Sequence, residues 1–324
     1  MRRALPGALS ATLLMGVAGA LHAQTTPEAL GWLRKIYEAT QKLSYSGTFV
    51  YQQGDRSETS RITRLVERDG ATERLEVLDG RPRVIVRTRD AVRCYYPGSR
   101  RVKVDRGGDL RTFPALLPEQ VASLAENYTI TMGETARVAG YDCRAVMLAP
   151  KDDLRYGYQL WADAATGMLL KARTVNDKGA VVEQFTFTQL DIGNVERDRL
   201  KLARIAGNWR VEDAAVVPVE GSQSGWRMAA DLPGFRRVAE VRRRLRESRL
   251  VHQVVFSDGL AAVSVFIEPL EGRREPVRVG LANMGAINMY RREVANHLVT
   301  VVGETPAASV QRIGNTVEYR GPAN

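Results

Sequence analysis

The sequence predicts an α+β fold that is mostly antiparallel β: a large N-terminal curved sheet covered by helices, and a smaller C-terminal α/β domain. Three observations indicate this class. Alternating apolar and polar runs, each closed by Gly, Pro or Asp, fill most of the chain up to residue 192. Only two stretches in that part have helical spacing. The alternation then breaks over residues 193–224 and resumes afterwards, as at a connection between two domains.

The first 23 residues are expected to be a cleaved secretory signal peptide. Arg2 and Arg3 precede the apolar run ALSATLLMGVAGAL, and ALHAQ offers a cleavage site after Ala23. Because that run is too short to cross a bilayer, a retained membrane anchor is the weaker alternative. We therefore expect a mature protein that is exported to the periplasm.

The N-terminal domain is expected over residues 24–192. It begins with an amphipathic helix at 27–43, because Thr26 is a suitable N-cap and Pro27 follows it. From YSGTFVYQQ onward the period changes to two, and ETSRITRLVE, RLEVLDG, RVIVRTRD and AVRCYYPG continue it. A short helix around residues 115–126 precedes five further strands, the last of them in VVEQFTFTQLDIG. Local connections of this kind are typical of one large antiparallel sheet.

The linker is expected over residues 193–224, which are mixed in character and end in Gly and Ser. The C-terminal domain then covers 225–324 and closes with a short helix that Thr305 would cap and Pro306 would start. Its strands are expected at 236–244, 250–257, 260–268, 285–292 and 297–303.

FSDGLAAVSVFIEPL, residues 256–270, is expected to form a hairpin of the C-terminal domain. Asp258 and Gly259 have the composition of its turn. Val263, Val265 and Ile267 alternate along the second strand and are expected to face the core.

The chain carries a positive charge, which bears on its partners. Without the signal peptide, 45 Lys and Arg residues face 37 Asp and Glu residues, for a net charge of +8. Such a surface favours anionic partners. Nucleic acid is not expected in a periplasm, which leaves acidic protein segments and phosphorylated lipid head groups.

The only two cysteines are Cys94 and Cys143, and both lie in the exported part. An oxidising compartment permits a disulfide between them. Two buried, unreactive thiols are an equally good interpretation, since sequence does not give the distance between the two residues.

No catalytic or metal-binding pattern is found, so an enzyme is not expected, nor any cofactor. The chain has none of the common nucleophile, zinc-protease or phosphate-binding motifs. His252 and His297 lie in strand-like runs, where half-exposed strand histidines are the simpler interpretation. Asp152 and Asp153 fall in a turn, which explains them without chemistry.

Apolar and aromatic side chains are abundant on the predicted N-terminal sheet. If the helices cover this surface only in part, the remainder forms a cavity for an acyl chain or an apolar peptide. A filled core is the alternative. The candidate cavity residues are Phe49, Tyr51, Leu65, Val84, Val86, Tyr156, Tyr158, Phe185 and Phe187.

RRVAEVRRRLRESR, residues 236–249, concentrates guanidinium groups, which suit carboxylates and phosphates. The alternative is a solvated edge strand whose charges prevent aggregation. The candidate residues for binding an anionic partner are Arg236, Arg237, Arg242, Arg243, Arg244, Arg246 and Arg249.

The chain resembles the MucB/RseB family of periplasmic regulators of an envelope-stress sigma factor. The N-terminal part of the resemblance is carried by YSGTFVYQQ, RLEVLDG, RVIVR, RYGYQLWADAATGMLLKA and VVEQFTFTQLDIG. DLPGF, SDGLAAVSVFIEPL and HLVTVVGETP carry it in the C-terminal part. Each stretch is weak alone, but they occur in order over nearly the whole mature chain.

The resemblance implies an N-terminal half-barrel like that of the lipoprotein carriers LolA and LolB, serving as a lipid-sensing domain. It also implies a C-terminal domain that binds the periplasmic part of a membrane-spanning anti-sigma factor and shields it from regulated proteolysis. Lipopolysaccharide or another acylated ligand would release that partner. A homo-oligomer is possible on this interpretation. The alternative function is a periplasmic lipid or lipoprotein carrier without a regulatory role, for which the first domain alone would suffice.

Overall fold

The computed structural model describes residues 24–106, 117–201, 209–214, 216–218, 224–244, 250–271 and 277–321. The expected signal peptide, residues 1–23, lies outside this part of the chain. Within these ranges, no helix combines the length and the apolar character needed to span a membrane.

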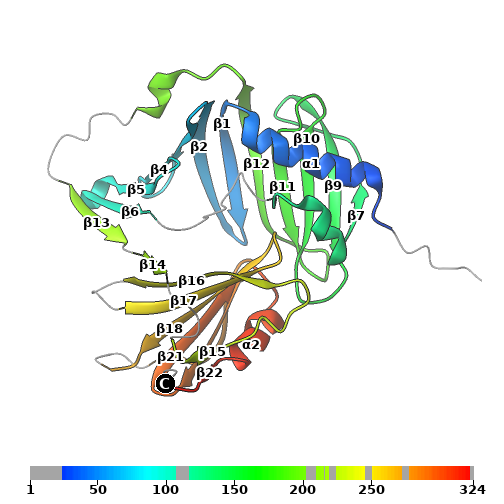
Figure 1. Ribbon diagram of the computed structural model, residues 1–324. Coiled ribbons are helices and arrows are strands. Elements are labelled where there is room, and N and C mark those ends of the chain that lie inside the picture. The colour runs from blue at the N-terminus through cyan, green and yellow to red at the C-terminus, as the bar shows by residue number, and fades with distance from the viewer. Residues whose placement is uncertain are drawn as a thin grey trace, which may run out of the picture.

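A large curved antiparallel sheet forms the N-terminal domain (Figure 1). In the described chain it has 13 strands in the order β13-β6-β5-β4-β3-β2-β1-β12-β11-β10-β9-β7, with β8 also paired to β9. All pairs are antiparallel except β13 with β6. The strands are β1 (Tyr45–Gln53), β2 (Arg56–Glu67), β3 (Gly70–Val77), β4 (Val84–Arg87), β5 (Val92–Tyr96), β6 (Arg101–Asp105), β7 (Tyr128–Met132), β8 (Ala136–Val138), β9 (Tyr141–Pro150), β10 (Gly157–Asp163), β11 (Leu169–Val175), β12 (Val181–Ile192) and β13 (Arg210–Ala214).

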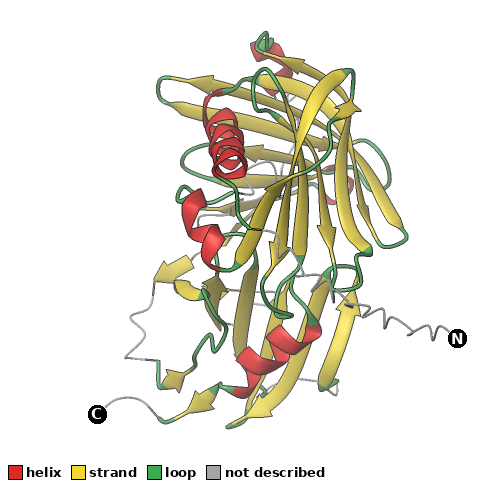
Figure 2. Ribbon diagram, turned by 90° about the vertical axis from the view of Figure 1, so that its right-hand side faces the viewer, coloured by secondary structure: helices red, strands yellow, loops and turns green. Residues whose placement is uncertain are grey.

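Helix α1 (Pro27–Lys42) begins where its sequence predicts, because the Thr26 side chain accepts a hydrogen bond from the Ala29 N–H at 3.2 Å. Its Leu33 and Ile36 are fully buried in the N-terminal core. The 3₁₀ helix η2 (Val121–Glu126) contacts α1, and Figure 2 shows both helices on the same side of the sheet. Residues 115 and 116 of the second helix, predicted around 115–126, lie outside the described part. Two short 3₁₀ turns, η1 (Pro97–Ser99) and η3 (Arg197–Leu200), complete this half.

The C-terminal domain contains a second, smaller antiparallel sheet in the order β14-β16-β17-β18-β21-β20-β19. Val263, Val265 and Ile267 are buried in its core, as the alternation predicts. Strand β19 was not predicted. The sheet strands are β14 (Val216–Pro218), β16 (Arg236–Arg244), β17 (Leu250–Ser257), β18 (Ala262–Pro269), β19 (Gly280–Met284), β20 (Ile287–Val294) and β21 (His297–Gly303).

Helix α2 (Ala307–Asn315) packs on β20 and β21, and a two-stranded ribbon, β15 (Trp226–Arg227) with β22 (Glu318–Tyr319), lies beside it. The predicted cap by Thr305 is wrong. Pro306 is the N-cap and offers no side-chain bond, while the Thr305 hydroxyl is buried and unpaired among the described residues. The fold class predicted from sequence, a large curved sheet followed by a smaller sheet domain, is confirmed.

The segment at 193–224 does more than connect the two domains. Its β13 pairs in parallel with β6 of the first sheet, and its β14 pairs with β16 of the second. A single residue, 215, separates these two strands in the chain. The segment therefore hydrogen-bonds to both domains.

Arg155 carries the main polar contact between the domains. Its side chain is fully buried and donates to Asp258 Oδ2 in the β17–β18 turn at 2.6 Å, and Asp258 is itself inaccessible. It also donates to the Pro233 carbonyl at 2.6 Å and, within its own domain, to Asp152 at 2.9 Å. The Tyr128 hydroxyl donates to the same oxygen of Asp258 at 3.2 Å. Buried ions of this kind are tolerated only when their hydrogen-bonding capacity is met, as it is here.

Two neutral contacts extend this interface. The Ser309 hydroxyl of α2 donates to the Leu154 carbonyl at 2.5 Å. The Asn288 side chain of β20 donates to the Tyr156 hydroxyl at 3.0 Å. Residues 154–156 therefore contact four separate segments of the C-terminal domain, and these contacts fix its position against the first sheet.

Candidate functional site

A pocket of about 220 Å³ lies on the inner face of the N-terminal sheet, where the C-terminal domain meets it. Strands β1, β2, β3, β4, β10, β11 and β12 contribute its lining. Two lining residues come from the C-terminal domain: Leu260 in the β17–β18 turn and Glu304 directly after β21. Since both domains supply lining residues, occupancy of the pocket depends on how they are docked.

The floor of the pocket is aromatic. Phe49 and Phe185, on the neighbouring strands β1 and β12, have ring centroids 6.5 Å apart in an edge-to-face arrangement. Tyr51 and Tyr158 extend the same surface, with Leu75, Ile85 and Leu260 beside it. A floor of this kind suits an alkyl chain, because it removes apolar surface from water. The volume is below that of sites for drug-sized ligands, which take about 300 Å³ or more, so a single chain is the appropriate size.

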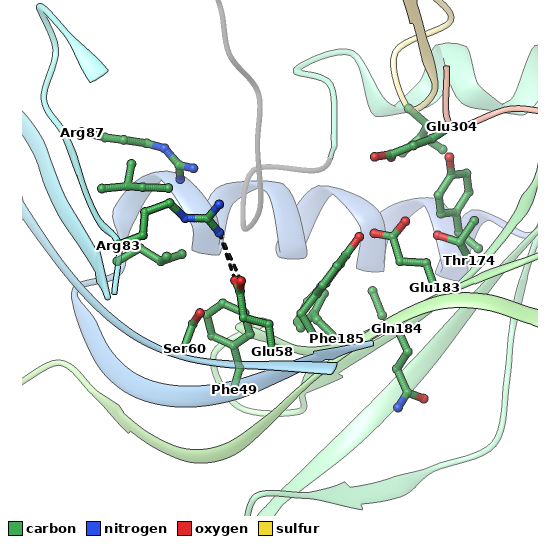
Figure 3. A pocket seen from close by; sticks show the side chains of 16 residues that line it. Phe49, Glu58, Ser60, Arg83, Arg87, Thr174, Glu183, Gln184, Phe185 and Glu304 are labelled. Atoms are coloured by element: carbon green, nitrogen blue, oxygen red, sulfur yellow. Dashed lines mark hydrogen bonds and ion pairs between the residues drawn. The ribbon is translucent and has the colours of Figure 1, made fainter. Parts of the chain in front are cut away.

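Two arginines, Arg83 and Arg87, stand at one end of the pocket, and each is paired with a carboxylate. Arg83 Nη2 lies 3.1 Å from Glu58 Oε1 (Figure 3). Arg87 forms a close ion pair with Glu73, a buried carboxylate that also pairs with Arg64 at 3.4 Å. Because Glu73 is shared by Arg64 and Arg87, this end is polar and keeps a net positive charge.

The opposite end is acidic. Figure 3 shows the carboxyl groups of Glu183, on β12, and Glu304 at the side of the pocket away from Arg83 and Arg87. Burial, together with the neighbouring Glu304 carboxylate, raises the pKa of Glu183 to about 7, against a smaller opposing effect of the Tyr51 hydroxyl. Glu304 is the more exposed of the two residues.

The structure brings four of the nine predicted cavity residues into this pocket: Phe49, Tyr51, Tyr158 and Phe185. Phe187 is 1% exposed and belongs to the filled core behind them. Tyr156 is directed to the domain interface instead, where Asn288 binds its hydroxyl.

The face assignment is corrected for the other three. Ile85 lines the pocket, so Val84 and Val86 lie on the opposite side of β4, because successive strand residues alternate. Leu65 is one position out of phase with Ser60 and Ile62, which face inward on β2. The alternation along both strands is as predicted. The residues that face the cavity, however, are the other half of each alternating set.

Sequence reasoning missed the charged lining residues, Glu58, Arg83, Arg87, Glu183 and Glu304. Charged positions in an alternating strand indicate a solvated face, and nothing local to them signals a pocket. One local signal exists: Glu183 alternates in phase with Phe185 and Phe187 in VVEQFTFTQ, which indicates that all three lie on the same face of the strand.

The arginine-rich stretch lies on β16, which is flanked by β14 and β17. Arg237 pairs with Glu240 at 2.6 Å, and Arg243 pairs across the domain boundary with Asp105 at 3.4 Å. Arg236 and Arg242 are exposed. The backbone of Arg244 belongs to the strand, and Arg246 and Arg249 lie outside the described residues. Of the candidate arginines, Arg237 and Arg243 thus form ion pairs within the chain, while Arg236 and Arg242 lie exposed on the surface.

His252 differs from the expected half-exposed histidine without an acidic partner. It is 8% exposed, and its Nε2 lies 2.8 Å from Glu240 Oε1 of the adjacent strand. Burial nevertheless lowers its pKa, with Glu240 opposing this. His297 instead contacts the Ala295 carbonyl through Nδ1 at 2.7 Å.

The two cysteines are both free. Cys94 is on β5 and Cys143 on β9, and seven strands of the same sheet lie between β5 and β9. The disulfide considered from sequence is therefore not formed. Burial raises the pKa of the Cys143 thiol to about 11 and also raises that of Cys94, so both are protonated at neutral pH and react slowly.

Comparison with protein families assigns both halves of the chain. The model of the MucB/RseB N-terminal domain matches residues 28–209, and that of the MucB/RseB C-terminal domain matches residues 220–318. The chain belongs to the MucB/RseB family.

Relatives in this family match over nearly their full length. The sigma factor AlgU regulatory protein MucB of Pseudomonas aeruginosa is 32% identical over 326 residues, which cover 97% of this chain and 98% of that protein. The sigma-E factor regulatory protein RseB of Escherichia coli K12 is 25% identical over 92% of this chain and 93% of its own length.

Solved MucB structures agree with this assignment. A crystal structure of MucB in complex with MucA(peri) superposes with a TM-score of 0.69 at 30% identity, covering 90% of this chain and 99% of that one. A crystal structure of MucB superposes with a TM-score of 0.67 at 29% identity, covering 91% of this chain and 98% of that one. The relatives of this MucB/RseB chain are thus named as regulatory proteins, and a similar structure has been solved with a bound partner.

Proposed function

We propose that this protein is a non-enzymatic periplasmic negative regulator of an envelope-stress sigma factor. It binds the periplasmic part of a membrane-spanning anti-sigma factor and protects it from regulated proteolysis. Lipopolysaccharide or another lipid-like signal releases the partner. Export through a signal peptide at residues 1–23 places it in the periplasm.

The observation that carries this proposal is the aromatic pocket at the domain junction. A regulator must couple two binding events, and a ligand shifts such an equilibrium only by its differential affinity for the two states. A pocket lined by Phe49 and Phe185 from one domain and by Leu260 and Glu304 from the other is sensitive to their arrangement. The regulatory names of the relatives and the MucB–MucA(peri) complex support the same partner class.

A protease-protection assay tests the proposal. The periplasmic segment of the cognate anti-sigma factor is incubated with its stress protease, with and without this protein, and lipopolysaccharide is then added. We expect the protein to slow cleavage, and lipopolysaccharide to restore it. Absence of protection together with saturable binding of an acyl chain would favour the lipid carrier instead.

The exposed arginines of β16 are proposed to bind an acidic segment of the anti-sigma factor. Replacing Arg236 and Arg242 together by Ala should weaken binding roughly tenfold at low salt and reduce its salt dependence, because exposed charge pairs are screened. Affinity is measured at several salt concentrations. The matched control also removes two charges, through Arg68→Ala and Arg81→Ala, which replace exposed arginines in the β2–β3 and β3–β4 connections of the other domain. Equal losses in both variants would mean that the overall charge of the protein, and not β16, attracts the partner.

A further inference from the structure

The outer face of the N-terminal sheet, opposite the pocket, carries two cations beside a tryptophan. Ala172 lines the pocket, so its neighbours Lys171 and Arg173 lie on the opposite face of β11, because successive strand residues alternate. Trp161 of β10 pairs with Lys171, and Gln184 of β12 pairs with Arg173. Trp161, Lys171, Arg173 and Gln184, which we call the Trp161 patch, are therefore neighbours on the outer face, and each is only partly buried.

The side chains of the patch hold one another in place. Lys171 Nζ lies 4.8 Å from the centroid of the Trp161 ring, and the guanidinium carbon of Arg173 lies 5.3 Å from the centroid of the same side chain. Arg173 Nε also donates a hydrogen bond to Gln184 Oε1 at 2.6 Å. The Gln184 amide in turn donates to Gln52 Oε1 of β1 at 3.0 Å. The two cationic groups are thus oriented on the sheet before any partner arrives.

The two positive charges have no carboxylate partner. Among the residues that the structure describes, neither Lys171 nor Arg173 forms an ion pair. Burial, together with the neighbouring Arg173 charge, lowers the pKa of the Lys171 ammonium group, and no described carboxylate opposes this. The side chains that flank the patch along the paired strands are uncharged, namely Ala145, Met147, Gln159, Val50, Gln52 and Thr186. An anionic partner would therefore offset a repulsion that the chain itself leaves in place.

This composition suits the anionic surface of a phospholipid bilayer. Lysine and arginine near such a surface each increase the affinity about fivefold, and tryptophan is enriched at the head-group level of membranes. Since the flanking side chains on β9, β12 and β1 are not acidic, a broad anionic surface is not repelled around the patch. A single soluble anion would engage the two cations alone, and the partly exposed indole ring of Trp161 would have no role in its binding.

We propose that the Trp161 patch binds the surface of an anionic phospholipid bilayer, while the pocket on the inner face of the sheet stays available to its own ligand. This contact needs no protein partner and does not depend on the proposed function. Together with that function, it would increase the effective concentration of the protein near a membrane-spanning anti-sigma factor.

Co-sedimentation of the full mature protein with phospholipid vesicles tests this proposal. We expect binding to vesicles that contain phosphatidylglycerol, and much weaker binding to vesicles of phosphatidylcholine alone. The double variant Lys171→Gln and Arg173→Gln should reduce the partition coefficient at least about tenfold at low salt. The matched control, Arg68→Gln with Arg81→Gln, removes two exposed charges from the β2–β3 and β3–β4 connections and should change that coefficient less than about twofold.

Fluorescence quenching locates the contact on the protein. Phosphatidylglycerol with brominated acyl chains should quench part of the tryptophan emission of the parent protein. Trp161→Phe should abolish that quenching, because the remaining tryptophans, Trp32, Trp209 and Trp226, lie outside the patch. This measurement decides the result should the double variant fail to fold, since it leaves both cations in place.

Several results would overturn the proposal. Equal losses in the two double variants would mean that the overall charge of the protein attracts the vesicles. Unchanged quenching in Trp161→Phe would place the contact on another surface. Release from the vesicles by inorganic phosphate, but not by chloride at the same ionic strength, would mean that the patch is a site for single anions. The protease-protection assay contains no phospholipid vesicles, so none of these results bears on the proposed function.

Discussion

Arg155→Met is expected to lower the free energy of unfolding by about 3–5 kcal/mol, because it leaves a buried carboxylate without its cation. The Asp258 side chain is inaccessible to solvent and loses its 2.6 Å contact to the guanidinium group. Asp152 and the Pro233 carbonyl lose their donor as well. Urea denaturation followed by circular dichroism measures the change. Because this ion pair joins the domains, the C-terminal domain should also become more accessible to limited proteolysis.

Arg312→Met is the control for this prediction. Arg312 pairs with Asp231 at 2.7 Å, but both side chains are about half exposed and both belong to the C-terminal domain. Exposed pairs contribute little, so its stability should stay close to that of the parent. If Arg155→Met were equally harmless, the interface around Asp258 would not be formed in solution.

Phe185→Asp is expected to lower the free energy of unfolding by about 3–5 kcal/mol through the lost ring alone, and further through burial of a carboxylate. Phe185 is 6% exposed and packs edge-to-face against Phe49 and Phe187. The same change places a charge on the pocket floor, so alkyl-chain binding should be lost in any fraction that folds. Thermal unfolding and decanol titration measure the two effects.

Gln189→Asp provides the matched change on the same strand. Gln189 is exposed, so a carboxylate there remains hydrated and should leave both folding and binding unchanged. Survival of both properties in Phe185→Asp would show that Phe185 faces solvent, contrary to the arrangement of β12 on the core.

The fold could be predicted from sequence because its signals are local. Thr26 and Pro27 define the start of α1 through contacts within one turn. Strands such as β12 follow from an alternation of period two. Alternation does not state which of the two faces is the inner one, and this is why Val84 and Val86 were assigned to the cavity instead of Ile85.

Asp258 shows why the site was harder to predict. One of its oxygens, Oδ1, accepts hydrogen bonds from the N–H groups of Leu260 and Ala261 at 3.0 and 2.9 Å, which is the turn chemistry that SDG predicts. The other, Oδ2, binds Arg155, 103 positions earlier in the chain. Only the first of these contacts is visible in a local pattern. Glu304 likewise lines the pocket only because the two domains are docked against each other. No local sequence pattern predicts that docking.

The strands β13 and β14 constrain how the two domains can move. With one residue between them in the chain, the first is bonded along β6 and the second along β16, so the chain passes directly from an edge of one sheet to an edge of the other. Translation of one domain away from the other would require one of these strands to detach. Rotation of one domain relative to the other about this connection leaves both sets of strand pairs intact. Any signal that loosens the Arg155 contact should therefore appear as a change of angle, with the largest displacement at the parts of the C-terminal domain farthest from β14.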